Sequence, residues 1–215
     1  MIKNIVWDIG NVIIELHITS YIDSLDYDFD TKEFLKEKVF RGDEWQRGMD
    51  IGTKTLAQAE EALCKRYPEK TQEITELLQT GFEPLFPVRK DVIGYISELR
   101  QSGYKEYILS NLSQEIHDCI RVQYPNFDNL FDGLIVSYKE GVIKPASEIE
   151  PTSNLYKRLL EKYQLKPEET VFLDDTPINI EMAKKLGIHG IIYKDLEQGK
   201  EELNKIITEY TEFIL

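Results

Sequence analysis

Short apolar runs alternate with longer helical patterns along most of the chain. The runs are rich in β-branched residues, are apolar on both faces, and cover residues 2–7, 104–109, 133–137, 170–173 and 190–193. Strands buried between two layers of helices have this character, whereas strands with one face in water alternate apolar and polar positions. The runs therefore predict five strands of a parallel sheet.

Helical periodicity occupies the intervals between these runs. Apolar residues recur three and four positions apart in four segments: Val92 to Leu99, Leu155 to Tyr163, Ile180 to Leu186 and Leu203 to Tyr210. Gly187 directly follows the third segment, where glycine commonly ends a helix. Because strand and helix alternate, the expected fold class is α/β, with a Rossmann-like, doubly wound parallel sheet.

The long segment from residue 16 to residue 86 contains no strand-like run. An apolar stripe around Leu35 predicts one helix, and Thr55 begins a capping box that opens another. We therefore expect a helical cap at residues 16–86, inserted into an α/β core made of residues 1–15 and 87–215.

Composition limits the possible partners. The 215 residues include 26 Lys and Arg against 39 Asp and Glu, a formal net charge of -13. Such a surface repels nucleic-acid backbones and anionic membranes, so neither is an expected partner. An anionic substrate must instead be attracted by a local positive feature, such as a bound cation or a few placed basic residues.

Cysteine use and hydropathy favour a cytoplasmic protein. Cys64 and Cys119 are too few for a zinc site or a disulfide framework, so reduced thiols are expected. Asp8 interrupts the apolar N-terminal run, which excludes a signal peptide, and no stretch approaches the length of a transmembrane helix. No pattern sets the oligomeric state, and a monomer and a weak dimer both remain open.

Polar side chains follow the apolar runs at one edge of the predicted sheet. Asp8 follows the first run, Ser110-Asn111 the second and Asp174-Asp175 the fourth, while Lys144 lies in the loop after the third. Ligands of parallel α/β sheets bind outside the carboxyl ends of the strands. Three carboxylates there would repel one another, and a divalent cation together with Lys144 balances their charge. Oxygen ligands at a phosphate site favour Mg²⁺.

The same arrangement prepares Asp8 for nucleophilic attack, because metal and lysine screen its charge from an incoming phosphate. Each residue has a simpler interpretation when taken alone. An aspartate after a strand is often a turn residue or a helix cap, Ser110 would be a helix cap, and Lys144 a surface residue. The functional interpretation depends on their falling together on one edge.

Four motifs in this order resemble the haloacid dehalogenase (HAD) superfamily over nearly the whole chain. They are Val6-Trp7-Asp8-Ile9-Gly10-Asn11-Val12, Ile108-Leu109-Ser110-Asn111, Lys144-Pro145, and Phe172-Leu173-Asp174-Asp175 with Asn179 following. The resemblance implies that the helical insert is a cap of the C1 type. It also implies a catalytic Asp8 that forms an aspartyl-phosphate.

The resemblance further assigns roles to the other motif residues. Magnesium would be held by Asp8, the backbone carbonyl of Gly10, and Asp174 or Asp175. Ser110, the amide of Asn111 and the catalytic Lys144 would bind the phosphoryl oxygens.

Gly10 departs from the usual phosphatase motif, in which a second Asp at this position protonates the leaving group. Losing a positioned general acid costs on the order of 10²–10⁴ in rate. The Gly-Asn-Val form is similar to a bacterial subgroup that contains α-glucose-1-phosphate phosphatases, whose anomeric leaving group needs less protonation. We therefore expect an activated phosphate substrate or a replacement acid, with Glu15, His17 and Glu44 as candidates.

Two further segments stand out: one is an expected insertion, and the cap stretch at residues 41–48 is the candidate specificity element. The spacing after Lys144 exceeds the family's, which predicts an insertion at residues 146–153 near the entrance. In the cap, Arg41 or Arg47 would meet substrate hydroxyls or a second anionic group, and Trp45 would stack on a sugar or pack between cap helices.

The sequence thus predicts magnesium-dependent hydrolysis of a small phosphorylated metabolite, with sugar phosphates as candidates. Two alternatives remain open. A 2-haloacid dehalogenase uses the same aspartate without metal, but it generally carries an aromatic residue at the position of Gly10. A catalytically weak relative would bind a phosphorylated ligand as a sensor.

Overall fold

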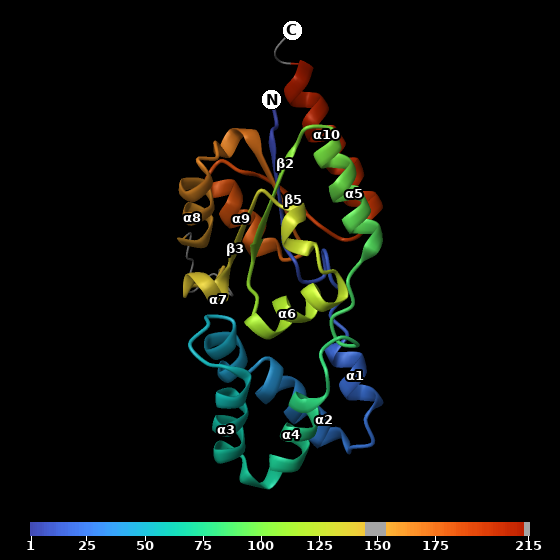
Figure 1. Cartoon of the computed structure of the whole chain (residues 1–215), viewed down its shortest axis with the longest axis vertical. Coiled ribbons are helices and arrows are strands. Elements are labelled where there is room, and N and C mark those ends of the chain that lie inside the picture. The colour runs from blue at the N-terminus through green and yellow to red at the C-terminus, as the bar shows by residue number, and fades with distance from the viewer. Residues whose placement is uncertain (145–153, 213–215) are drawn as a thin grey trace.

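The computed structural model describes residues 1–144 and 154–212. Figure 1 shows a lobe built on a sheet with flanking helices, and a second, helical lobe below the sheet. The N-terminus and the end of the C-terminal helix, at Glu212, lie on the sheet lobe, at the side away from the helical one. The insertion predicted at residues 146–153 lies outside the described residues.

The sheet consists of five parallel strands in the order β3-β2-β1-β4-β5. Their bounds are β1 Asn4–Trp7, β2 Lys105–Ser110, β3 Gly133–Val136, β4 Thr170–Asp174 and β5 His189–Ile192. The strand at the centre is β1, where Trp7 lies level with Ile108 of β2 and Leu173 of β4. The predicted parallel α/β sheet is confirmed.

Helices cover both faces of the sheet. Successive residues of β1 point to opposite faces, so they pack against different helices. Ile5 and Trp7 pack in an apolar cluster with residues of α5 and α10, whereas Val6 packs in a second cluster with residues of α8 and α9. The helices of this lobe are α5 Lys90–Gln101, α6 Gln114–Gln123, η4 Phe127–Leu130, α7 Ser137–Glu140, α8 Asn154–Tyr163, η5 Pro167–Glu169, α9 Pro177–Lys185 and α10 Leu196–Glu212. This two-sided cover explains why the strands are apolar on both faces.

The insert between β1 and α5 is helical, and we call it the cap. Its elements are α1 Ile18–Ser24, α2 Phe29–Phe34, η1 Leu35–Phe40, η2 Glu44–Met49, α3 Leu56–Arg66, η3 Pro68–Lys70 and α4 Thr71–Gln79. The capping box at Thr55 is confirmed, since its side chain accepts from Gln58 N and the Gln58 side chain accepts from Thr55 N. The boundaries at residues 15/16 and 86/87 stay a prediction.

The two connections between cap and sheet lobe run side by side. Ile14 and Val88 form an isolated antiparallel bridge, and Glu15 N donates to Pro87 O at 3.0 Å. The cap therefore joins the sheet lobe through a paired stem that starts just after β1.

Strand ends differ from the sequence prediction by one or two residues. Ser137, predicted as the end of the third strand, opens α7 instead. Its hydroxyl accepts from Leu112 N at 2.8 Å and donates to Leu112 O at 3.3 Å, which ties α7 to the loop after β2. These bonds join residues 25 positions apart, so a tertiary contact accompanies the end of the strand at Val136.

Other sequence-level expectations can be compared with the structure directly. Cys64 and Cys119 are both free thiols, as predicted. Gly187 adopts a φ of +84° directly after the C-cap of α9, in the left-handed conformation that glycine tolerates without strain. None of the helices in the described part of the chain is long and apolar enough to cross a membrane.

Candidate active site

Three carboxylates and one ammonium meet at the carboxyl edge of the sheet. One oxygen from each of Asp8, Asp174 and Asp175 lies within 4.8 Å of the other two. Lys144 Nζ donates to Asp8 Oδ1 at 2.7 Å and to Asp174 Oδ2 at 2.6 Å. Because β1 and β4 are adjacent and in register, the residues at their ends become neighbours. The structure thus brings together four side chains that the sequence predicts to share the carboxyl edge of the sheet. We call this edge, with Asp8, Lys144, Asp174 and Asp175, the rim.

These charges are removed from water. Only 1% of Lys144, 0% of Asp174 and 7% of Asp8 is exposed. Burial raises the pKa of Asp8 to about 7, although attraction to Lys144 opposes it. Burial lowers the pKa of Lys144, but Asp174 and Asp8 together outweigh it, so the net shift is upward. The lysine therefore keeps its charge.

One ammonium cannot balance three carboxylates. Asp8, Asp174 and Asp175 present oxygen atoms only, and they converge from the ends of two neighbouring strands. Hard oxygen donors with excess negative charge suit Mg²⁺ rather than a soft transition metal. The donor set at this rim therefore fits a divalent cation.

Neighbouring amides hold the carboxylates in place. Asn179 Nδ2 lies 3.0 Å from each oxygen of Asp174, and Thr176 N donates to Asp174 Oδ1 at 2.8 Å. Asn11, in a left-handed conformation with φ of 54°, donates to Asp175 Oδ2 at 2.8 Å. Asn11 is a positioning residue that sequence reasoning missed. Residue type alone does not predict the left-handed conformation that Asn11 adopts four residues after the end of β1.

The loop after β2 fixes Lys144. Asn111 Oδ1 accepts from Lys144 N at 2.7 Å, and Asn111 Nδ2 donates to Lys144 O at 3.5 Å. Ser110, with 0% exposure, donates to Asn111 O at 3.2 Å and is one of the groups that lower the pKa of Asp8. The side chain of Asn111 thus holds the lysine's main chain, a role that nothing in the sequence indicates.

Gly10 carries no acid, and space alone does not require glycine there. A Cβ at this position would meet its nearest neighbour, Leu16 Cδ1, at 3.6 Å, an ordinary contact. Two of the predicted replacement acids are next to the stem. Glu15 pairs with Arg89 at 3.5 Å and with His17 at 2.6 Å. The two side chains therefore contact each other, and Glu15 also contacts Arg89.

The other predicted cap residues do not converge on this rim. Glu44, only 5% exposed, pairs with Arg66 at 2.9 Å and with Lys54. Trp45 is buried against Phe40, with ring centroids 4.6 Å apart, which is the packing role anticipated for it. The exposed Arg41 and Arg47 form pairs within the cap, with Glu37 and Asp43 respectively.

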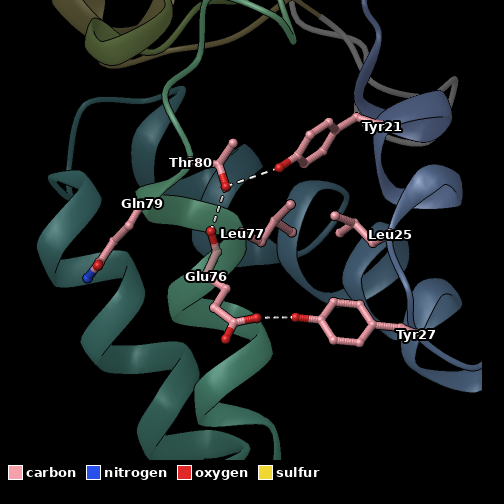
Figure 2. A pocket seen from close by; sticks show the side chains of 7 residues that line it. All are labelled: Tyr21, Leu25, Tyr27, Glu76, Leu77, Gln79 and Thr80. Carbon is pink, nitrogen blue, oxygen red and sulfur yellow. Dashed lines mark hydrogen bonds between the residues drawn. The ribbon is translucent and has the colours of Figure 1, made fainter.

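A separate hollow of about 370 Å³ lies within the cap, between α1 and α4 (Figure 2). Apart from Gln79, whose amide donates to Glu60 at 3.2 Å, its polar side chains bond to one another or to the main chain that lines it. Tyr21 Oη donates to Thr80 Oγ1 at 3.2 Å, Thr80 Oγ1 donates to Glu76 O at 2.7 Å, and Tyr27 Oη donates to the Glu76 carboxylate. None of its lining residues comes from the sheet edge, so the acidic rim remains the candidate for catalysis.

Comparison with known proteins supports this choice. Residues 2–187 match the family model of the haloacid dehalogenase-like hydrolases. The chain is 30% identical over 219 residues to a D-ribitol-5-phosphate phosphatase from Bacteroides thetaiotaomicron, which covers 96% of this chain and 99% of that protein.

Solved structures agree on the fold. A predicted HAD-like family hydrolase from Porphyromonas gingivalis superimposes with a TM-score of 0.71 at 24% identity, covering 96% of this chain and 98% of that one. A HAD family enzyme from Bacteroides thetaiotaomicron, solved in complex with magnesium and inorganic phosphate, gives a TM-score of 0.69 at 20% identity, covering 90% and 95%.

Proposed function

Since this chain belongs to the haloacid dehalogenase-like hydrolases, we propose that it is a magnesium-dependent phosphatase that acts on a small phosphate monoester through Asp8. One observation carries the proposal. The buried Lys144 ammonium bonds both Asp8 and Asp174, while the Asp175 carboxylate lies within 4.8 Å of both. A phosphoryl group bound there would face an anchored carboxylate, a fixed positive charge and a set of metal ligands.

Asp8, the Gly10 carbonyl, Asp174 and Asp175 would hold the Mg²⁺ in this proposal. When bound, Mg²⁺ lowers the repulsion between the carboxylates and the phosphate and polarises the phosphoryl oxygens. Asn179 keeps the Asp174 carboxylate oriented through a bond of 3.0 Å, and Asn11 does the same for Asp175 at 2.8 Å. Fixed ligand orientation is what such neighbouring groups contribute to metal affinity.

Asp8 is the nucleophile in the proposed reaction. Its oxygen attacks phosphorus, the bond from phosphorus to the alcohol oxygen breaks, and an aspartyl-phosphate forms. Water then attacks this phosphorus and releases phosphate, which restores the carboxylate. Burial supports the role, because a carboxylate without a full water shell needs less desolvation before it attacks.

Lys144, Ser110 and the amide of Asn111 would bind the phosphoryl oxygens. The lysine is held through its backbone by Asn111 and through Nζ by two carboxylates, so its charge is preorganised. Preorganised positive charge in a buried site stabilises the negative charge of a phosphoryl transition state.

The substrate class we propose is the phosphate ester of a sugar or sugar alcohol. Its support is the similarity over nearly the whole chain to a ribitol-5-phosphate phosphatase, together with the Gly10-Asn11-Val12 form of the first motif. The sugar 1-phosphate preference expected from that motif remains part of the proposal and is untested.

The experiment compares two chemistries on purified protein with Mg²⁺. Phosphate release from ribitol 5-phosphate and from an aryl phosphate is measured beside chloride release from 2-chloropropionate. Asp8→Asn is isosteric but not nucleophilic, so it should abolish phosphate release and leave the circular dichroism spectrum unchanged. Turnover retained by Asp8→Asn, or chloride release by the wild type, would exclude the proposed function.

A further inference from the structure

The hollow within the cap forms where two segments far apart in the sequence face each other. Tyr21 of α1 and Tyr27, which follows that helix, both reach across to α4, and Figure 2 shows them at opposite ends of the hollow. Leu25 and Leu77 lie between the two rings and give the hollow an apolar part. Its volume of about 370 Å³ is at the lower end of the range of small-molecule sites.

The hydroxyl protons that line the hollow are already donated inside the protein. Tyr21 Oη donates to Thr80 Oγ1 at 3.2 Å, and Thr80 Oγ1 donates to Glu76 O at 2.7 Å. Tyr27 Oη donates to the Glu76 carboxylate. Because a hydroxyl carries one proton and two lone pairs, both phenol oxygens can only accept further hydrogen bonds.

Gln79 carries the N–H groups among the described side chains of the lining. Its Nε2 donates to Glu60 Oε1 at 3.2 Å, on the side of α4 away from the two tyrosines in Figure 2. The space between the tyrosines is therefore bordered by acceptor oxygens. A phosphate group or another anion brings only acceptors of its own, so this lining does not suit an anion.

Glu76 gives the hollow a negative charge. Its carboxylate accepts from Tyr27 and, at 2.9 Å, from Gln72 Nε2, and these bonds, the one from Tyr27 first, lower the pKa of Glu76. The same bond raises the pKa of Tyr27 to about 12, so the phenol keeps its proton at neutral pH. Within residues 1–144 and 154–212, Glu76 forms no ion pair and no basic side chain lines the hollow. A bound cation would balance this charge.

The lining favours an organic cation over a metal ion. Mg²⁺ and Ca²⁺ prefer several convergent oxygen ligands, whereas Glu76 is the one carboxylate among the described lining residues. The N–H groups of an ammonium can bond to Glu76 and to the phenol oxygens, and the rings of Tyr21 and Tyr27 attract its charge. An alkyl chain on the same nitrogen can contact Leu25 and Leu77.

We propose that this hollow binds a free aliphatic amine through its primary ammonium group, at a site separate from the catalytic rim. The ammonium donates to the Glu76 carboxylate and to a phenol oxygen, and the alkyl chain lies against the two leucines. Bound there, the amine connects α1 and α4, the first and last helices of the cap. The proposal concerns binding alone and does not depend on the phosphatase function.

The test titrates n-butylammonium into ¹⁵N-labelled protein and follows the amide signals by NMR. About 0.15 M NaCl screens the general attraction of a cation to a chain with a net charge of -13. The signals of α1 and α4 should shift and saturate, with a Kd on the order of 1 mM. Shifts spread over the whole acidic surface without saturation would overturn the proposal.

Two further probes separate the contributions on the wild-type protein. n-Butanol has the same chain without the charge and should bind at least about tenfold more weakly. n-Butyltrimethylammonium has the same chain and charge without N–H groups and should bind at least about fivefold more weakly. Equal affinity for either probe would contradict recognition of a primary ammonium. Tighter binding of Nα-acetyl-lysine methylamide than of n-butylammonium would assign the hollow to a lysine of a protein partner and would also overturn the proposal.

A matched pair of variants locates the site. Glu76→Gln keeps the shape and an acceptor for Tyr27 but removes the charge, so it should weaken n-butylammonium binding at least about tenfold. Glu61→Gln makes the same change at an exposed position of α3 and should match the wild type. Equal affinities of the two variants would show that the amine does not bind at Glu76. The comparison of probes on the wild type stands whatever the stability of the variants.

Discussion

Glu106 gives a pH-dependent stability that can be calculated from its surroundings. It lies on β2 with 0% exposure, and its Oε2 accepts from Trp7 Nε1 at 2.6 Å. Among the described residues Oε1 has no hydrogen-bond partner. Burial raises the pKa of Glu106 from 4.5 to about 8, while the Trp7 bond and the attraction of Arg100 lower it by less. The folded protein therefore keeps a proton that the unfolded chain releases.

The sign of the effect follows from this difference. Below about pH 4.5 both states are protonated and the pKa difference costs nothing, whereas between the two pKa values the unfolded state gains stability as pH rises. Each pH unit in this window is worth about 1.4 kcal/mol. Between about pH 5 and pH 7.5 the folded state should lose about 3 kcal/mol through Glu106 alone. Glu106→Gln cannot titrate and should not lose it.

Urea unfolding, followed by tryptophan fluorescence, measures the free energy of unfolding of both proteins at each pH. The stability of Glu106→Gln relative to the wild type should rise by about 3 kcal/mol from about pH 5 to pH 7.5, because costs that do not depend on pH cancel in this comparison. Glu98→Gln, an exposed change on α5, serves as the control and should show no such rise. A relative stability that stays constant with pH would refute a protonated Glu106 in the folded protein.

Two further predictions concern the charges of the rim. Chelation should abolish phosphate release and added Mg²⁺ should restore it, because the three carboxylates exceed what Lys144 can balance; activity indifferent to chelator would favour the dehalogenase chemistry. Lys144→Met leaves Asp8 and Asp174 buried without their common partner, so the metal-free protein should lose about 3–5 kcal/mol in the free energy of unfolding. Adding Mg²⁺ should recover part of that loss in thermal melts. The exposed control Lys157→Met should change neither the free energy of unfolding nor its response to Mg²⁺. A metal-free Lys144→Met protein as stable as the wild type would contradict the assigned pairing.

The sequence alone predicted the helices, the strands and the residues of the rim, because short-range sequence patterns indicate all of them. Apolar runs bounded by polar residues mark buried parallel strands, and Asp8, Ser110 and Asp174 appear at their carboxyl ends whatever the order of the strands. The rule that ligands bind at these ends then places the polar residues on a common edge. The HAD-like family, the α/β class and the free thiols all follow from such local signals, and all three are confirmed.

Tertiary structure alone decided which polar groups touch. The order β3-β2-β1-β4-β5 makes Asp8 the neighbour of Asp174, and no local pattern encodes that order. The bond between Asn111 and Lys144 spans 33 positions, and burial of Lys144 depends on the packing around it. Periodicity reports contacts a few residues apart, whereas the chemistry of this protein depends on distant segments packed at one edge.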